Sequence, residues 1–472
     1  MTPFTIDRFE RALETILSSL PTGSRPAHLC VGLSGGLDSS VLLAALADLG
    51  RRDAAKRWTV RALHVDHSLH ADSVRWSHAS RALAQACDVP FDEIRVDAAA
   101  APGESPEATA REARYTAFRQ RLAPGEVLLT AHHADDQLET VLLQWLRGGG
   151  LRAIAGMPLL APLGAQAWHA RPLLGFERGA LERFARERGL AWVEDPSNVD
   201  LRFDRNYLRH AVLPALITRW PAAARTVGRV AEYARDAVAI EAELAAEDLA
   251  RVRRGRAVRL EALQELPPAR QRAALRAWLA TLGLPTPAAR TLAALQRDVA
   301  LAAVDRVPRT RWPGAVVHRY RACLHADSDV ETTLAPGDWL EPVRHPRYGS
   351  GADLALELLP GVGVGLSRAR LPTRLRVTRR REGEEFLPAG RTHRRPLRKW
   401  FQEHDVLPWR RENLPLLRDD ADGIVAVADL ASAHDYAAEP GEPSLRIVWH
   451  GRGIVTESDA FGFKWPGRPP IG

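Results

Sequence analysis

Cysteine is scarce in this chain. Cys30, Cys87 and Cys323 stand far apart, with no CxxC pair and no spacing typical of a disulfide framework. Disulfide-rich secreted domains and cysteine-bound metal sites both need paired or clustered cysteines, so these two classes are excluded. Long apolar runs are also missing, because none approaches the roughly 20 residues that a membrane-spanning helix needs. These absences predict a protein of the reducing cytoplasm that does not enter a membrane.

Lysine is nearly absent too, since Lys56, Lys399 and Lys464 are the only lysines among 65 basic residues. The net charge is nevertheless +7, with a pI of about 9.7, which favours a polyanionic partner. The excess is local, because residues 371–418 hold 13 Arg and Lys against 6 Asp and Glu. This segment therefore carries a net +7, as much as the whole chain. It is the predicted contact surface for a nucleic acid, with a solubilising face as the alternative.

Short apolar stretches alternate with helix-like stretches in the first third of the chain. Strands are predicted at 27–33, 58–65, 91–97 and 126–131, and helices at 40–49, 72–87, 104–121 and 135–147. This alternation predicts an α/β fold, a doubly wound parallel sheet with helices on both faces. Ligands of such sheets bind beyond the carboxyl ends of the strands.

The chain changes character after this alternation. Pro158, Pro162 and Pro172 predict loops. Helical periodicity at about 215–300 predicts a helical domain, and short β-like runs at 371–447 predict a small α+β domain.

The loop between the first predicted strand and helix carries the strongest chemical signal. It consists of Ser34, Gly35, Gly36, Leu37, Asp38 and Ser39. Glycines let the backbone approach a ligand, serines offer hydroxyl groups, and the N-terminus of the following helix favours an anion such as phosphate. A GxxxxGK[ST] loop with its lysine is absent. Asp38 stands here instead, and a carboxylate beside phosphates is expected to hold Mg²⁺. An ordinary glycine turn is the alternative.

A second polar motif, HHADDQLET, follows the strand predicted at 126–131. Asp136 and Glu139 are three residues apart at a helix start, so both project from one face. Two carboxylates near a nucleotide would attract a positively charged co-substrate. Acids that merely complement the dipole of the first helical turn are the alternative.

Two pairs of arginines are candidates for binding, the first to phosphates or an α-carboxylate and the second to RNA. Arg111 and Arg114 lie three apart in AREARY, and Arg205 and Arg209 lie four apart in DRNYLR. A solvated helix face has the same pattern, so the residues alone leave both roles open.

Several motifs occur in a fixed order, namely SGGLDSS, HVDHSLH, AREARY, AHHADDQLETVLLQWLRGGG, EDPSN and RNYLRHAVLP. SGGxDS resembles the loop of the N-type ATP pyrophosphatases, or PP-loop enzymes, which cleave ATP between the α- and β-phosphates. The whole series resembles the tRNA(Ile)-lysidine synthetase family over roughly residues 25–447. GLPTPAARTL and REGEEFLPAGRTHRRPLRKWF extend this likeness beyond the first domain.

The resemblance implies a ligase that attaches lysine to C2 of the wobble cytidine in tRNA(Ile) with a CAU anticodon. ATP would adenylate O2 of the cytosine and release pyrophosphate, and the ε-amine of free L-lysine would then displace AMP. The expected co-substrate is ATP and the expected metal is Mg²⁺. The expected partners are that tRNA and lysine, with no membrane. The oligomeric state stays open, a homodimer included.

The resemblance also implies roles for the residues named above. Loop residues 34–39 would bind ATP, Asp38 would hold Mg²⁺, and His132 with Arg114 or Arg111 would stabilise charge at the α-phosphate. Asp136 and Glu139 would bind lysine, and Asp136 is the first candidate for the base, with Glu139 second. The expected tRNA contacts are Arg205, Arg209, Arg394, Arg395, Arg398 and Lys399, with Trp400 and Phe401 beside the last four.

Composition and resemblance together predict the domain boundaries. The expected parts are a PP-loop catalytic domain at 1–215, a mainly helical substrate-contacting domain at 216–330, a connector at 331–370, a basic tRNA-binding domain at 371–447 and a tail at 448–472.

Three other classes fit the residues less well. A tRNA thiolase of the same PP-loop group would need paired cysteines or a cysteine-bound cluster, and the three cysteines are isolated. An amidotransferase-type synthetase would need an N-terminal nucleophilic cysteine or a glutaminase domain. A non-catalytic RNA-binding protein with a relict nucleotide loop would have no use for Asp38 or for the pair Asp136 and Glu139.

Overall fold

The computed structural model describes most of the chain. The described residues are 3–21, 28–52, 58–66, 73–96, 106–164, 167–194, 200–301, 309–329, 339–342, 347–348 and 356–449. Residues 67–70 of HVDHSLH, 195–198 of EDPSN and the predicted tail from residue 450 onward lie outside them. The chain divides into two compact units, Met1–Ile240 and Glu241–Gly472. The finer five-part division stays a prediction.

The first unit is built on one six-stranded sheet. Its strands are β1 (His28–Gly32), β2 (Thr59–Asp66), β3 (Phe91–Arg95), β4 (Val127–Leu129), β5 (Leu160–Leu163) and β6 (Ala167–Ala170). Their order is β3-β2-β1-β4-β6-β5, and all neighbours pair in parallel except β5, which is antiparallel to β6. The predicted parallel sheet is confirmed, with a hairpin added at one edge.

The loop predicted around Pro162 is wrong, because this residue is part of β5 and lies opposite Trp168 of β6. β5 is the last strand of the sheet and has a single neighbour. Proline is tolerated in such an edge strand, since its missing N–H removes no hydrogen bond to a second neighbour.

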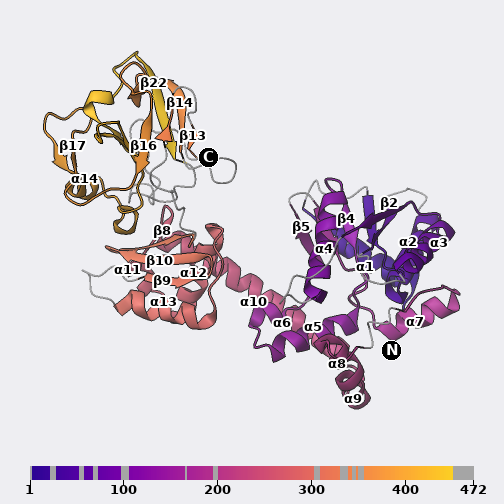
Figure 1. Cartoon of the computed structure of the whole chain (residues 1–472). Coiled ribbons are helices and arrows are strands. Elements are labelled where there is room, and N and C mark those ends of the chain that lie inside the picture. Colours follow the sequence, from indigo (N-terminus) through magenta and orange to yellow (C-terminus); the bar gives the residue numbers. More distant parts are fainter. Residues whose placement is uncertain are drawn as a thin grey trace. The chain divides into compact units, whose positions relative to one another are not determined.

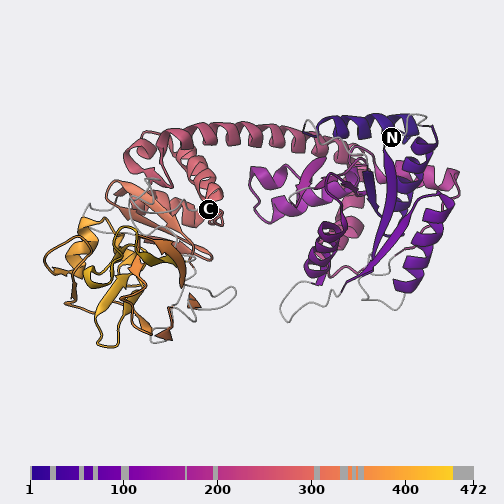
Figure 2. The ribbon, with the colours of Figure 1, turned by 90° about the horizontal axis from the view of Figure 1, so that it is seen from above.

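Helices cover both faces of this sheet (Figures 1 and 2). The helices of the first unit are α1 (Ile6–Ser18), α2 (Leu37–Arg52), α3 (Ser73–Ala86), α4 (Pro106–Arg121), α5 (Ala134–Leu146), α6 (Leu151–Ile154), α7 (Arg178–Glu187), α8 (Asp204–Tyr207), the π-helical turn η2 (Leu208–Val212), α9 (Leu213–Arg219) and the start of α10 (Ala223–Val252). Of these, α9 and the start of α10 pack on α5. Successive side chains of a strand point to opposite faces. Leu29 and Val31 of β1 therefore pack in a core with α1, α2 and α7, whereas Cys30 packs with Phe118 of α4.

The sheet order decides where functional loops meet. β1 and β4 are parallel neighbours, with Val31 beside Leu129. Their carboxyl ends therefore lie at the same edge of the sheet. The loop that follows β1 leads to α2, and the loop that follows β4 leads to α5. The two predicted motifs are thereby brought together.

The second unit contains the end of α10 and, among its described residues, four antiparallel sheets. Its other helices are α11 (Leu260–Gln264), α12 (Pro268–Thr281), α13 (Ala289–Leu301), α14 (Leu397–Glu403) and the 3-10 turns η4 (Pro408–Arg410) and η5 (His434–Tyr436). A five-stranded antiparallel sheet joins β7 (Arg253–Arg254), β8 (Ala257–Arg259), β11 (Cys323–Asp327), β10 (Ala315–Tyr320) and β9 (Arg309–Trp312). Its core, with α12 and α13, surrounds the fully buried Trp278. The domain predicted to be helical at about 215–300 therefore also contains strands, which belong to this sheet.

The C-terminal part of the second unit is rich in short strands. One sheet has the order β12 (Trp339–Leu340), β16 (Leu375–Thr378), β19 (Leu416–Arg418), β20 (Ile424–Val427) and β21 (Ala431–Ser432). Another has the order β13 (Arg347–Tyr348), β14 (Leu356–Val362), β22 (Pro443–Trp449) and β15 (Leu366–Ser367), and β17 (Glu385–Phe386) pairs with β18 (Arg395–Pro396). This agrees with the predicted small α+β fold. Over the described ranges, no helix has both the length and the apolar character to cross a bilayer.

A buried ion pair inside the first unit allows a stability test. Glu126 is 3% exposed and accepts hydrogen bonds from Arg61 Nε at 2.6 Å and Nη2 at 2.8 Å. We expect Glu126→Gln to lower the free energy of unfolding by about 1.5–3 kcal/mol, because it weakens charge-assisted hydrogen bonds to a partly buried guanidinium. Calorimetry of the full chain at pH 7 measures this change.

The control is Glu112→Gln, which removes an exposed pair with Arg119 and should cost under about 1 kcal/mol. Burial raises the pKa of Glu126, but its bonds to Arg61 and to the Ala123 N–H outweigh burial and hold the pKa below its usual range. The stabilisation is therefore present above the ordinary carboxyl pKa of about 4.3 and is lost as the pH falls below it. Equal losses for both variants at pH 7 would contradict the assignment.

Candidate active site

The loop after β1 is held in a conformation that suits glycine. Gly35 has a φ of +80°, in the left-handed region that residues with a side chain rarely adopt. A Cβ atom here would lie 2.9 Å from Oγ of Ser80 and 3.4 Å from the carbonyl oxygen of Trp76. The carbonyl of Gly35 accepts a hydrogen bond from the Val193 N–H at 3.0 Å. The glycine is therefore required by the backbone itself.

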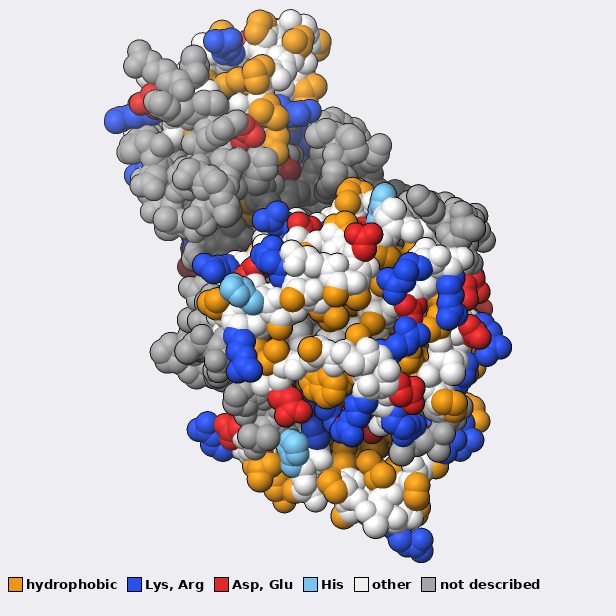
Figure 3. Space-filling model, turned by 90° about the vertical axis from the view of Figure 1, so that its right-hand side faces the viewer, with side chains coloured by type: hydrophobic (Ala, Val, Ile, Leu, Met, Phe, Trp, Pro, Cys, Tyr) orange, Lys and Arg blue, Asp and Glu red, His pale blue; other side chains and the backbone are white. Residues whose placement is uncertain are grey.

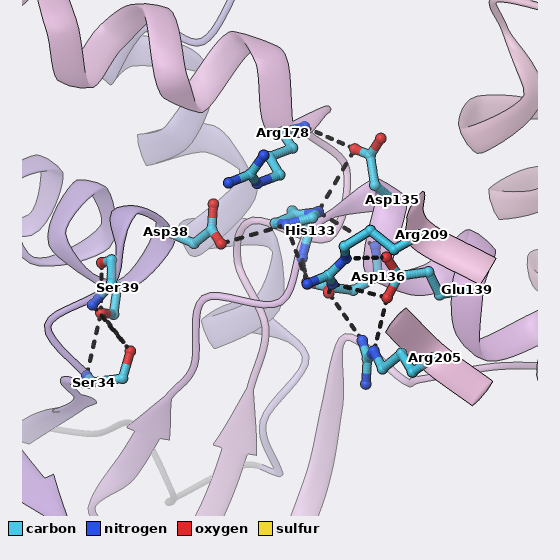
Figure 4. Close-up of polar contacts among 11 residues, drawn as sticks. Ser34, Asp38, Ser39, His133, Asp135, Asp136, Glu139, Arg178, Arg205 and Arg209 are labelled. Carbon is cyan, nitrogen blue, oxygen red and sulfur yellow. Dashed lines mark hydrogen bonds and ion pairs between the residues drawn. The ribbon is translucent and has the colours of Figure 1, made fainter. Parts of the chain in front are cut away.

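Hydroxyl groups close this loop onto the first turn of α2. Oγ of Ser34 and Oγ of Ser39 are 3.0 Å apart, and the Ser34 N–H donates to Oγ of Ser39 at 3.2 Å (Figure 4). Oγ of Ser39 in turn donates to the carbonyl of Gly36 at 3.0 Å. Leu37 is buried and anchors the helix start. The residues predicted to bind ATP thus form one hydrogen-bonded turn at a helix N-terminus, a geometry that favours anions.

One carboxylate oxygen of Asp38, Oδ1, is buried without a hydrogen bond from the described residues. Buried carboxylate oxygens are nearly always satisfied by a donor or a cation. The described residues include no group of three or more His, Cys, Asp or Glu placed to hold a metal. A cation bound through one carboxylate and phosphate oxygens, as Mg²⁺ often is, fits this setting.

His133 connects the loop to the second motif (Figure 4). It is the N-cap of α5, where its N–H donates to Oδ2 of Asp136 at 3.0 Å and its Nδ1 accepts from the Asp136 N–H at 3.3 Å. Its Nε2 lies 3.5 Å from Oδ2 of Asp38 and 3.3 Å from Oδ2 of Asp136. Burial lowers the pKa of His133, but the carboxylates of Asp136 and Asp38 outweigh burial and raise it. The ring therefore bridges the two motifs.

The sequence analysis gave His133 no role. Histidine is not a preferred N-cap residue, so the acid three residues later was the only sequence signal for this position, and it was weak.

Asp136 and Glu139 each contact two arginines. Nε of Arg205 donates to Glu139 at 2.7 Å and its Nη2 donates to Asp136 at 2.9 Å. Nε of Arg209 donates to Glu139 at 2.6 Å and its Nη2 donates to Asp136 at 3.2 Å. Both carboxylates are buried. The residues predicted for lysine and for tRNA thus lie in one cluster with two charges of each sign, which the sequence analysis did not foresee.

This cluster keeps Asp136 ionised. Burial raises the pKa of Asp136, but His133 and Arg205 outweigh burial and lower it to about 2. A carboxylate with so low a pKa is a poor proton acceptor for as long as the guanidinium groups hold it.

His132, the residue before His133, is neutral. It is half-buried, and its Nδ1 lies 2.8 Å from Oγ1 of Thr130. Burial lowers its pKa, Asp136 opposes this, and the charges of Arg171 and nearby arginines, Arg111 included, bring the pKa to about 3. Arg111 also lies over the ring of Tyr115, with 5.0 Å to the ring centre. The role assigned to Arg114 stays a prediction.

The predicted tRNA contacts of the second unit differ in exposure. Arg394, Arg398 and Lys399 are exposed, and Arg395 forms an ion pair with Glu403 at 2.6 Å. Trp400 and Phe401 are buried in the core of this unit, so the expectation that they flank a contact surface is wrong. They point inward from α14 while the basic residues point to solvent.

The local charge excess is smaller than the count over 371–418 suggested. Asp420 pairs with Arg374 at 2.9 Å, and Asp422 pairs with both Arg376 and Arg381. These acids lie just after the counted segment and neutralise part of it. Figure 3 draws a face of the first unit in its foreground, where basic, acidic and hydrophobic side chains are interspersed.

Comparisons with known proteins cover nearly all of the chain. Residues 6–216 match the PP-loop domain, residues 259–325 the TilS substrate binding domain, and residues 375–449 the TilS substrate C-terminal domain. A tRNA(Ile)-lysidine synthase of Methylococcus capsulatus is 38% identical over 92% of this chain and 99% of its own length. This chain belongs to the tRNA(Ile)-lysidine synthase family. A member from Alkalilimnicola ehrlichii is 41% identical over 92% of this chain and 96% of its own length.

Membership in the tRNA(Ile)-lysidine synthase family confirms the resemblance and the fold class. It also makes the chain an enzyme that uses ATP as a co-substrate through its PP-loop domain. Among solved structures, a U34-tRNA thiolase from Methanococcus maripaludis covers 48% of this chain and 78% of its own, with 14% identity and a TM-score of 0.40. That likeness is too partial to bear on function.

The cysteines give a thiolase no support. Burial in β1 raises the pKa of the Cys30 thiol to about 12, so the thiol stays protonated and is a poor nucleophile. Burial also raises the pKa of Cys87. None of these three cysteines forms a disulfide.

Replacing Gly35 by alanine tests the phosphate loop. We expect Gly35→Ala to weaken ATP binding at least tenfold, because the substitution strains a positive φ by about 1–2 kcal/mol and crowds Ser80. The matched control is Gly50→Ala in α2, the helix that follows this loop, where a Cβ meets nothing within 4 Å. Titration calorimetry with ATP measures both. Equal affinities for the two variants would show that the loop does not bind the nucleotide.

Proposed function

We propose that this chain attaches L-lysine to C2 of the wobble cytidine in tRNA(Ile) with a CAU anticodon, at the expense of ATP. The observation that carries the proposal is the position of His133 between Asp38 and Asp136. It joins a phosphate loop to a carboxylate site through one side chain. An adenylated base and an amine nucleophile need such adjacent sites. The enzyme works in the cytoplasm, where tRNA, ATP and free lysine occur together.

The first step transfers AMP to the cytosine. O2 of the base attacks the α-phosphate, the bond from the α-phosphorus to the bridging oxygen breaks, and pyrophosphate leaves. The turn from Ser34 to Ser39 binds the phosphates through backbone N–H groups and hydroxyls at the N-terminus of α2. His132 and an arginine of α4 donate hydrogen bonds to oxygens of the α-phosphate as their charge grows.

Asp38 is the residue that would hold Mg²⁺, and its unpartnered Oδ1 fits that role. When bound, the ion would neutralise charge on the phosphate oxygens. The contribution of the chain is to orient the Asp38 carboxylate beside His133.

The second step joins lysine to the base. The ε-nitrogen bonds to C2, the bond from C2 to O2 breaks, and AMP leaves with that oxygen. Free lysine is almost wholly protonated at pH 7, since its pKa is about 10.4. Its ammonium group is attracted by Asp136 and Glu139, and a carboxylate accepts the proton that the amine must lose.

Lysine must compete with the arginines already present. Asp136 and Glu139 are bonded to Arg205 and Arg209, so the cluster has no net negative charge to offer. The ammonium of lysine replaces at least one guanidinium. Arg205 and Arg209 are then free to bind phosphates of the tRNA. Asp136 becomes a better base when it loses Arg205, because the charge of Arg205 contributes to its low pKa.

The target cytidine lies in a single-stranded loop, where a base can be turned out for a few kcal/mol. The second unit contributes a distant contact, through the exposed Arg394, Arg398 and Lys399, that helps to distinguish this tRNA from others with the same anticodon.

Asp136→Asn separates the two steps. We expect lysine attachment to fall at least about a hundredfold, as removal of a base commonly causes, while tRNA-dependent exchange of pyrophosphate into ATP continues. Incorporation of radiolabelled lysine into the tRNA and the exchange reaction measure the two steps separately. Asp204→Asn is the control, since Asp204 forms an exposed pair with Arg147 beside the cluster. Full lysine attachment by Asp136→Asn would rule out the base.

The double variant Arg394→Gln and Arg398→Gln tests the distant contact. We expect weaker tRNA binding and a plot of log affinity against log salt whose slope is shallower by about 1.5, because two phosphate contacts are lost. Filter binding at several salt concentrations measures this slope. The control, Arg374→Gln, removes a charge that Asp420 already neutralises. Identical slopes for both proteins would place the contact elsewhere.

A further inference from the structure

A chain of hydrogen bonds in the first unit leads from Arg171 to His132. Nη2 of Arg171 lies 3.1 Å from Nδ1 of His169. Nε2 of His169 lies 2.8 Å from Oγ1 of Thr130, and the same oxygen lies 2.8 Å from Nδ1 of His132. The four residues come from the ends of β4 and β6, which are parallel neighbours. Neither Arg171, His169 nor Thr130 belongs to a motif that sequence analysis singled out.

The direction of this chain is fixed by Arg171. A guanidinium has donors and no acceptor, so Nδ1 of His169 accepts and the ring carries its proton on Nε2. That N–H donates to Oγ1 of Thr130, and the Thr130 hydroxyl donates to Nδ1 of His132. A neutral His132 then carries its proton on Nε2. With Nδ1 engaged by Thr130, Nε2 is the ring nitrogen that can donate to a ligand.

The surroundings keep both rings neutral. Burial lowers the pKa of His169 to about 2, with Arg171 as the next cause. His132, with a pKa of about 3, faces Asp136 of α5, Arg205 of α8, Arg111 of α4 and Arg171 beyond β6. Asp136 alone among these favours the charged ring. Between about pH 5 and 9 neither histidine changes its charge, so the order of donors and acceptors stays the same.

Arg171 is a buried cation with uncharged hydrogen-bond partners. It is 6% exposed, and burial lowers its pKa, which the hydroxyl of Tyr115 opposes through a hydrogen bond. Its Nη1 donates to the carbonyl of Pro158 at 2.8 Å, and its Nε has no partner within the described part of the chain. A buried cation with uncharged partners is unfavourable, so a purely structural role would be better met by an uncharged residue. What Arg171 supplies to His169 is a group that can only donate a hydrogen bond, at 3.1 Å from Nδ1.

We propose that Arg171, His169 and Thr130 are positioning residues that hold His132 as a neutral Nε2–H donor to an α-phosphate oxygen during adenylation. This inference rests on the proposed function. The other tautomer would turn a lone pair toward an anionic oxygen and repel it. A protonated ring would donate as well, but its charge would fade near neutral pH. This relay of Arg171, His169 and Thr130 keeps Nε2 of His132 a hydrogen-bond donor at every physiological pH.

The test compares Thr130→Val with Thr130→Ser. Valine has the shape of threonine without the hydroxyl, so His132 loses the donor that selects its tautomer. We expect kcat for tRNA-dependent pyrophosphate exchange to fall about tenfold to a hundredfold, with KM for ATP unchanged, and serine to restore most of it. His169→Phe should show a similar loss, and the double variant with Thr130→Val should lose little more, since both act through one relay. Additive losses, or full activity in Thr130→Val, would overturn the proposal.

A second readout does not depend on activity. In the full chain labelled with ¹⁵N-histidine, ring NMR signals distinguish Nε2–H from Nδ1–H, and His132→Gln assigns the relevant signal. We expect Nε2–H in the unaltered protein and a mixture of tautomers in Thr130→Val. A protonated His132 at pH 7, or an Nδ1–H tautomer, would refute the relay. If the unaltered protein shows Nε2–H but attaches no lysine to tRNA, the proposed function fails and the tautomer assignment stands.

Discussion

The turn between β1 and α2 is the constraint on which the account depends. Gly35 takes a positive φ there, its carbonyl is fixed by the Val193 N–H, and Ser34 and Ser39 close the loop. This geometry directs the N–H groups of the helix start toward the edge of the sheet where β4 also ends. A residue with a side chain at this position would disturb the turn and every group that the turn orients. The phosphate loop is thus a property of backbone conformation before it is a property of side chains.

Charge balance governs the other half of the site. Two carboxylates and two guanidinium groups form a buried cluster in which no charge is left unpaired. Such a cluster is stable in the absence of substrates, and it must exchange partners to accept an ammonium group. The neutral histidines behind it supply hydrogen bonds without adding to this balance. The site therefore combines a cluster of ion pairs that can exchange partners with neutral histidines whose hydrogen-bond donors and acceptors stay the same.

Much of this arrangement was predictable from the sequence, because local patterns decide it. Alternating strands and helices predicted the parallel sheet, and SGGLDSS and HHADDQLET marked the loops that meet at its edge. Contacts between distant segments were not predictable. Nothing in the sequence near Asp136 reveals that Arg205 and Arg209 cover it, or that Arg171 fixes the ring of His169. Periodicity also gave no warning that α14 directs Trp400 inward, because a basic segment this short has no clear apolar face.

A structure of the full chain with Mg²⁺ and an ATP analogue that resists cleavage between the α- and β-phosphates tests the central claim most directly. The account predicts that the β- and γ-phosphates lie against the N–H groups of residues 35–39, with the α-phosphate facing His132 and the cation on Asp38. A triphosphate bound away from this turn, or a cation with no contact to Asp38, would contradict it.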